Sequence, residues 1–162
     1  MGNYYCLMAG VPDLNLDDRG GNYTIDDFIE ECGEALSDSD KKLLFYFFLK
    51  YDCLNLVNLL QNPDAEIQPY GNYTIDQYRD LMTSAREMNF NVHRYPAFLS
   101  MFAREYSYNK GKAGYFPKDA IMKEYYEYAM KCPNRMISSW FKMNFDITNI
   151  LTAMIARKNG WN

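Results

Sequence analysis

One sequence pattern occurs twice in this chain: an aromatic residue, Asp, two variable residues, Asn and an aliphatic residue. It reads YDCLNL at residues 51–56 and FDITNI at residues 145–150. Asp and Asn are mediocre helix formers, yet both copies lie within long apolar stretches of helical periodicity, so hydrogen bonds to these side chains must offset the cost. Residues three apart share one helix face, so each pair is placed to join neighbouring helices or loops. The four side chains concerned are Asp52, Asn55, Asp146 and Asn149.

The two copies predict an all-α fold, a bundle of about six helices with two related helical modules at about residues 1–63 and 64–162. We interpret the Asp–Asn pairs as structural residues whose hydrogen bonds hold the repeated helical modules together. The alternative is that the pairs contact a binding partner directly. A chain of 162 residues is long enough to bury a core as one domain. Only residues 4–7 suggest a strand.

The spacing of apolar residues predicts where the longer helices lie. Apolar residues at steps of one, three and four from Leu43 to Leu60 predict a long helix that starts at the Ser/Asp cluster of residues 37–40. It should end near Asn62, because Pro63 disfavours helical geometry in the residue before it. Three more helices are expected: one after Pro96, one from Pro117 to Lys131, and one from about Asn134 to Gly160, a residue suited to the C′ position.

A second repeat marks two helix starts. The sequence GNYTIDDF at residues 21–28 recurs as GNYTIDQY at residues 71–78. Thr24 and Thr74 are suited to accept a hydrogen bond from the backbone three residues on, and Gln77 to close a capping box. Helices are therefore expected over residues 25–36 and 75–88.

Composition excludes several classes of protein. The net charge is −4 and the pI about 5.0, so the chain lacks the basic field typical of nucleic-acid binding. The longest apolar runs, residues 43–49 and 150–156, are far shorter than the ~20 residues of a membrane helix, so no direct membrane insertion is expected. The first residues have no basic start and no long apolar stretch, which favours a cytoplasmic location. Four scattered cysteines without a C-x-x-C pair are expected to be reduced core thiols.

The sequence offers no convincing site for catalysis, a cofactor or a metal. Residues 13–24 copy the first ligands of a calcium loop, but the sixth and twelfth positions are Asp18 and Thr24, where Gly and Glu are needed. His93 has no acid or Cys at ligand spacing. Acidic pairs such as Glu124 with Glu127 lie on faces expected to be solvated. We therefore predict that the protein is not an enzyme, takes no small-molecule substrate and acts through partners.

The motif at residues 145–150, followed by ARKNG at residues 156–160, resembles a motif of one family of rotary-ATPase components. This family is the C subunit of archaeal and vacuolar-type ATPases, which is named the d subunit in eukaryotes. The helix around residues 50–52 resembles an earlier copy of the same motif in that family. The opening YYCLMAGVPD at residues 4–13 and the overall layout are similar to an uncharacterised bacterial family encoded beside V-type ATPase genes. Two departures are Ile155, where the ATPase family often has a basic residue, and the absence of a basic tail before Pro63.

This resemblance implies a non-catalytic adaptor that links the central stalk of a V-type ATPase or ATP synthase to the membrane rotor ring in ion transport, including proton transport. It implies a cytoplasmic protein held at the inner membrane by protein partners. Family members are longer, with three related helical domains, so the resemblance also implies the N-terminal part of a longer protein. Arg157 and Lys158 join the two Asp–Asn pairs as candidate interaction residues. The alternative is a free-standing helical scaffold or regulator unrelated to the ATPase.

Overall fold

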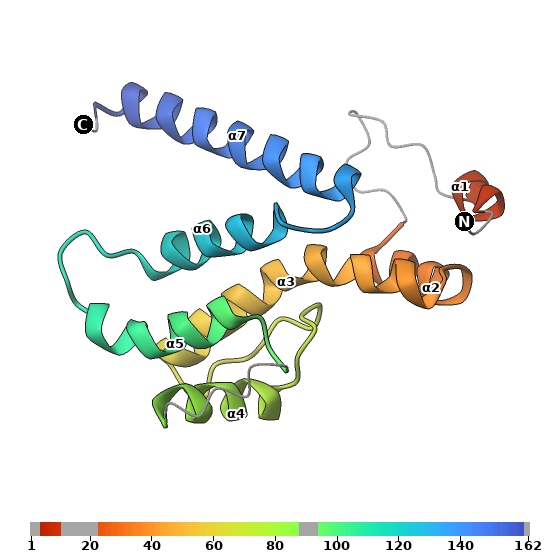
Figure 1. Cartoon of the computed structure of the whole chain (residues 1–162). Coiled ribbons are helices and arrows are strands. Elements are labelled where there is room, and N and C mark those ends of the chain that lie inside the picture. Colours follow the sequence, from red (N-terminus) through yellow and green to blue (C-terminus); the bar gives the residue numbers. More distant parts are fainter. Residues whose placement is uncertain (1–3, 11–22, 88–93, 161–162) are drawn as a thin grey trace. The chain divides into compact units, whose positions relative to one another are not determined.

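The computed structural model describes residues 4–10, 23–87 and 94–160, and every regular element in these ranges is a helix (Figure 1). The all-α prediction is confirmed, and a bundle of about six helices fits roughly. The helices are α1 (Tyr5–Gly10), α2 (Ile25–Ala35), α3 (Asp38–Gln61), α4 (Ile75–Arg86), α5 (Ala97–Asn109), α6 (Pro117–Ala129) and α7 (Arg135–Lys158). The chain forms two compact units, Met1–Phe45 and Tyr46–Asn162, and the predicted module boundary near residue 63 stays a prediction.

The first unit contains α1, α2 and the start of α3. The strand suggested at residues 4–7 is wrong: this segment begins a helix, in which the Met8 amide donates to the Tyr4 carbonyl at 2.9 Å. A strand needs a neighbouring strand to satisfy its backbone, and none exists among the described residues, whereas a helix satisfies its backbone internally. The Tyr4 hydroxyl donates to Asp40 and accepts from the Ser37 amide, which joins residue 4 to the start of α3.

Both predicted helix caps form. Thr24 and Thr74 each accept a hydrogen bond from the backbone three residues on, at 3.1 and 3.4 Å. In return, the side chains of Asp27 and Gln77 accept from the backbone amides of Thr24 and Thr74. Both GNYT segments therefore end in complete capping boxes, although only the one closed by Gln77 was predicted.

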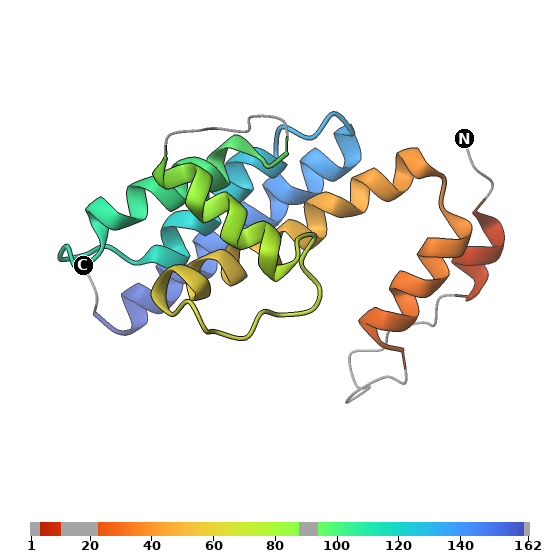
Figure 2. The same ribbon diagram turned by 90° about the horizontal axis from the view of Figure 1, so that it is seen from below.

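The second unit is built around the part of α3 from Tyr46 onward. The helices α4, α5 and α6 pack in chain order, and α7 lies along α6 (Figures 1 and 2). Aromatic rings fill the layer between α3, α6 and α7: Phe47 lies 5.1 Å from Phe141, and Tyr125 lies 5.7 Å from Phe141, measured between ring centroids. The Tyr125 hydroxyl also donates to the Tyr46 carbonyl, which ties α6 to α3. Tyr125 and Phe141 are buried, and burying such rings stabilises the packing of these helices.

Most predicted helix ends are close to the observed ones. The helix α3 ends at Gln61, one residue before Asn62, and Gly160 has a φ of +67°, as its predicted C′ role requires. The helix α6 ends at Ala129, two residues earlier than predicted, in a turn where the Cys132 amide donates to the Ala129 carbonyl. The helix α4 ends at Arg86, before the predicted end at residue 88, which lies outside the described residues.

Three of the four cysteines are buried, namely Cys32, Cys53 and Cys132, while Cys6 is exposed, so the expectation of core thiols is wrong for Cys6. A six-residue helix such as α1 covers too little surface to bury both of its faces. All four cysteines are free thiols.

The helix α3 is long and apolar enough to cross a membrane by length and composition, with a mean hydropathy of 1.4 over its most apolar window. This is weak evidence for a membrane span, because the core helix of a soluble protein passes the same test. Polar residues interrupt the apolar ones along α3, so the length of its uninterrupted apolar runs does not reveal this property. In its second half α3 buries Asp52 and Asn55 with polar partners, which is typical of a core helix.

Candidate interaction site on the Asp–Asn motifs

The Asp52 carboxylate is fully buried and is surrounded by hydrogen-bond donors from one loop and one helix. It accepts from the Asn72 side chain at 2.6 Å, from the Tyr73 backbone amide at 3.2 Å and from the Tyr78 hydroxyl at 2.6 Å. Residues 71–74 are the second GNYT segment, and Tyr78 lies in the first turns of α4. Asp52 therefore anchors both the loop before α4 and α4 itself to α3.

Asn55 completes the anchor from the same face of α3. Its side-chain amide donates to the Gln68 carbonyl at 3.0 Å and accepts from the Gln68 amide at 2.8 Å, so it pairs with that residue as a neighbouring strand would. The amide nitrogen also lies 3.3 Å from the Tyr78 hydroxyl. No buried side-chain polar atom in the described part of the chain lacks a partner. Two polar residues in an apolar helix are thus accommodated without an unsatisfied group.

Gly71 lets the loop approach this pair closely. A Cβ atom at this position would lie 2.7 Å from the Asp52 carboxylate, 2.7 Å from the Tyr78 hydroxyl and 3.1 Å from the Asn55 amide. All three neighbours are held in the buried network, so none can move aside without breaking a hydrogen bond. The glycine of the GNYT segment is therefore required by packing.

Electrostatics around Asp52 reflect burial opposed by hydrogen bonding. Burial raises the pKa of the Asp52 carboxyl, while the bonds from Tyr78, Asn72 and the Tyr73 amide counter the increase. Burial, together with the negative charge of Asp52, raises the pKa of Tyr78, so this phenol keeps the proton it donates. Burial also raises the pKa of the neighbouring Cys53 thiol well above its usual range, which leaves it protonated and unreactive.

The second copy of the motif has entirely different surroundings. Asp146 and Asn149 lie on α7, both side chains are exposed, and neither makes a hydrogen bond to any residue that the structure describes. The other polar residues along this part of α7 bond to their own helix: Thr148 donates to the Asn144 carbonyl, and Thr152 to the Thr148 carbonyl, each at 2.8 Å. The structure therefore brings Asp52 and Asn55 into one site and leaves Asp146 and Asn149 outside any site in the described part of the chain.

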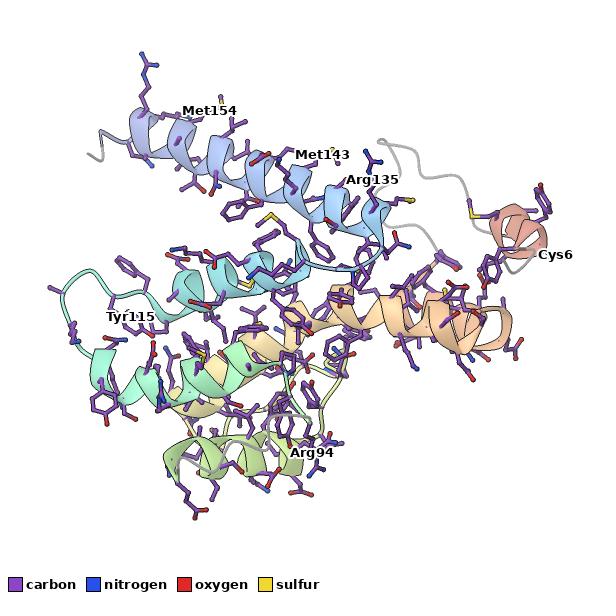
Figure 3. The ribbon with its side chains drawn as sticks, viewed as in Figure 1. Cys6, Arg94, Tyr115, Arg135, Met143 and Met154 are labelled. Atoms are coloured by element: carbon purple, nitrogen blue, oxygen red, sulfur yellow. The ribbon has the colours of Figure 1, made fainter. Side chains whose placement is uncertain are left out.

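An apolar face of α7 accompanies the second copy. Large apolar side chains recur at steps of three and four and so lie on one side of the helix, with two more beside them. Figure 3 shows Met143 and Met154 on the side of α7 that faces away from α6. The exposed residues are Met136, Trp140, Met143, Ile147, Ile150, Leu151, Met154 and Ile155, and we call them the α7 outer face.

Four of the eight equivalent positions in α3 are fully buried. Aligning the two motifs places Met143, Ile147, Ile150 and Leu151 opposite Leu49, Cys53, Leu56 and Val57, which are each 0% exposed. Ile150, for comparison, is 59% exposed. A row of exposed apolar side chains along one helix is a feature on which proteins bind one another. The α7 outer face with Asp146 and Asn149 is therefore the candidate site.

The remaining predicted residues are placed nearby. Arg157 and Lys158 are exposed in the last turn of α7, where their positive charges interact favourably with the negative end of the helix dipole. Sequence reasoning missed Gln68, Gly71 and Tyr78 as members of the first network. The glycine that begins both GNYT segments was the signal that a close backbone approach was required there.

The described residues give no support to the metal-binding and acid–base candidates considered from the sequence. Among the residues placed in the structure, no group of three His, Cys, Asp or Glu side chains is arranged to hold a metal ion. His93 and most of the calcium-loop-like segment lie outside the described residues. Glu124 and Glu127 are exposed, as expected, and Glu127 lies 3.9 Å from Lys123.

A family model described as "Protein of unknown function (DUF2764)" matches residues 1–162. No curated protein and no solved structure matches the chain.

Proposed function

We propose that this chain, which belongs to the DUF2764 family, is a non-catalytic helical adaptor that acts by binding other proteins through the outer face of α7. The observation that carries the proposal is the contrast between the two motif copies. The α3 copy is covered by a loop and a helix, whereas the α7 copy has the same polar pair and an apolar face that no described residue covers. A helix with an apolar outer face of this kind is a docking surface.

We further propose that the machine served is a V-type ATPase or ATP synthase, in which the adaptor joins the central stalk to the membrane rotor ring. The support is the resemblance of residues 145–160 and of residues 50–52 to the C subunit of these ATPases. Such a part needs binding surfaces and no active site, and it would be cytoplasmic and held at the inner membrane by its partners. Arg157 and Lys158 extend the surface at the end of α7.

Exposed aromatic side chains at the turn between α5 and α6 favour a second contact region. Tyr108 and Phe116 are 75% and 66% exposed, and they flank a turn in which Gly111 and Gly114 take positive φ angles. Acidic residues lie close to them in the sequence, at positions 105 and 119. Interface cores are enriched in aromatic residues, so this turn is suited to contact a protein of the stalk or of the ring.

The rival function is a free-standing helical scaffold or regulator with no link to the ATPase. The same α7 face would serve it, so the identity of the bound proteins decides between the two. Affinity co-purification of the tagged full-length protein from its own cells in mild detergent, with mass spectrometry of the bound proteins, makes this measurement. Recovery of ring and central-stalk proteins supports the ATPase role, whereas unrelated soluble partners favour the scaffold.

Matched variants assign the contact to α7. Ile150→Asp and Met154→Asp place charges on the α7 outer face, where both side chains are exposed, so the helical fold should be retained. Loss of the bound proteins is expected, since a charge in an apolar interface is costly. Lys123→Asp on the exposed side of α6 is the control and should keep the partners. Equal recovery with all three variants would show that α7 is not the binding face.

A further inference from the structure

The α7 outer face contains a regular row of six apolar side chains. They follow one another at steps of four, three, four, three and four residues, and each is between 42% and 81% exposed. Alternating steps of three and four are the heptad spacing with which one helix packs along another. The six residues are Met136, Trp140, Met143, Ile147, Ile150 and Met154, and we call them the α7 seam.

The second half of α7 is exposed on all its sides. Every residue from 146 to 155 is exposed, whereas the first half packs on α3 and α6 through Phe141. Helices in proteins take most of their stability from the packing of an apolar face. A second helix along the seam would supply this packing, and it would approach from the side facing away from α6, where Met143 and Met154 lie (Figure 3).

The seam is complementary to itself. Its steps read the same from either end, so a second α7 laid antiparallel along it places every seam residue at the level of another. The contact is then isologous: both copies use the same patch, as in most dimers of soluble proteins. The pairs formed in this way are Met136 with Met154, Trp140 with Ile150, and Met143 with Ile147, each occurring twice.

The charges of α7 favour the antiparallel over the parallel arrangement. Parallel helices would place every charged residue beside its own copy, so all these contacts would join like charges. In the antiparallel arrangement, Lys142 of one copy lies on the same flank as Asp146 of the other, within one helical turn along the axis. Like charges meet only at the ends, where Arg157 and Lys158 of one copy lie near Arg135 of the other.

We propose that two copies of this chain pair through the α7 seam, with the two α7 helices antiparallel and a two-fold axis near residue 145. The inference rests on the proposed function, in which α7 is a binding face, and it names what covers this face when no other protein is bound. Because both contacts use the same side chains, a second copy and another protein compete for the seam. Three of the six seam residues are methionines, whose flexible side chains adapt to different partners, so a weak and exchangeable pair is expected.

Charge pairs introduced into the seam test both the contact and its register on the full chain. Analytical ultracentrifugation of the unaltered chain should show a reversible equilibrium between monomer and dimer. Ile147→Lys and Met143→Glu should each weaken it at least about tenfold, because each places a charge in an apolar contact. An equimolar mixture of the two variants should regain dimers, because residue 147 of one copy lies beside residue 143 of the other.

Two further mixtures serve as matched controls. Ile147→Lys with Met154→Glu introduces the same charges at positions that do not meet, so this mixture should associate as weakly as its components. Ile147→Lys with Ile147→Glu should regain fewer dimers than the first mixture, since these residues lie side by side only in a parallel pair. All the altered side chains are exposed, so circular dichroism should show an unchanged helical content.

Salt distinguishes the apolar seam from a contact between charges. Both copies carry the same net charge of −4, and the seam itself is apolar. High salt should therefore leave dimerisation unchanged or strengthen it. Dimers that are lost at high salt would come from another surface and would overturn the proposal.

A chain that stays monomeric up to hundreds of micromolar also overturns the proposal, as does a dimer that Ile147→Lys and Met143→Glu leave unaltered. Sedimentation of a monomeric chain with phosphatidylglycerol vesicles, lost on Ile150→Asp, would assign the seam to a membrane surface instead. The proposed function fails separately. It is lost if co-purification with Ile150→Asp and Met154→Asp recovers the same bound proteins as the unaltered chain, whether or not that chain dimerises.

Discussion

The helices α3 and α7 are both 24 residues long and carry the same motif, but they differ in almost every aspect of their surroundings. Asp52 and Asn55 are fully buried and bonded, and the apolar residues beside them are covered. Asp146 and Asn149 are exposed and have no partner among the described residues, and the apolar residues beside them face outward. The comparison teaches that the motif itself does not determine its burial: the same polar pair is fully bonded where a loop and a helix cover it and stays exposed where no described residue does.

The comparison can first be tested with apolar residues at equivalent positions. Leu56→Ala should lower the free energy of unfolding by about 2–5 kcal/mol, because the site is fully buried and a cavity would remain. Ile150→Ala, its exposed equivalent, should change it by no more than about 0.5 kcal/mol. Urea unfolding followed by circular dichroism measures both. Equal losses would mean that α7 is covered in solution by another surface.

The aspartates of the two motifs should show the next largest difference in unfolding free energy. Asp52→Ala leaves the Tyr78 hydroxyl, the Asn72 amide and the Tyr73 N–H without their acceptor, and should cost about 2–4 kcal/mol of unfolding free energy. Asp146→Ala removes no hydrogen bond to a described residue and should change the unfolding free energy by no more than about 0.5 kcal/mol. The same denaturation assay compares them. A neutral Asp52→Ala would contradict the buried network.

Alanine substitutions at two glycines distinguish close packing, which matters at Gly71, from helix propensity, which matters at Gly33. Gly71→Ala should destabilise the protein by about 1–3 kcal/mol, because its methyl group would push against three atoms of the Asp52–Asn55 network. Gly33→Ala on α2 meets no atom within 4 Å, so it should stabilise the protein by about 0.5–1 kcal/mol through higher helix propensity. Opposite signs of the two effects are the expected result. A stabilising Gly71→Ala would show that the loop is not held close to α3.

The smallest expected effect is a pH dependence specific to the α3 copy. Burial raises the pKa of Asp52 in the folded state above its unfolded value, so folding favours the protonated form. The stabilising contribution of Asp52 is therefore complete below the unfolded pKa and is lost as pH rises through the raised folded pKa. The unfolding free energy of the unaltered chain minus that of Asp52→Asn should fall as pH rises from about 4 to 7. A difference that is constant or rises with pH contradicts the assigned direction.

Much of the local structure follows from the sequence alone because the signals involved are local. The end of α3 before Pro63, the start of α6 at Pro117, the capping boxes at Thr24 and Thr74, and the C′ glycine at residue 160 each depend on a few neighbouring residues. The need of Asp52 and Asn55 for hydrogen-bond partners was also predictable, since it follows from burying polar groups in an apolar helix.

Tertiary structure decided which partners those side chains receive and which copy of the motif receives them. Gln68, Asn72 and Tyr78 lie 13, 20 and 26 residues from the side chains they bond, so no local pattern could identify them. The two motifs are alike in sequence and so predict hydrogen-bond partners for both pairs, yet among the described residues a loop and a helix pack only over the pair of α3. Burial is a property of what surrounds a helix, and short-range spacing along one chain determines the helix but not its surroundings.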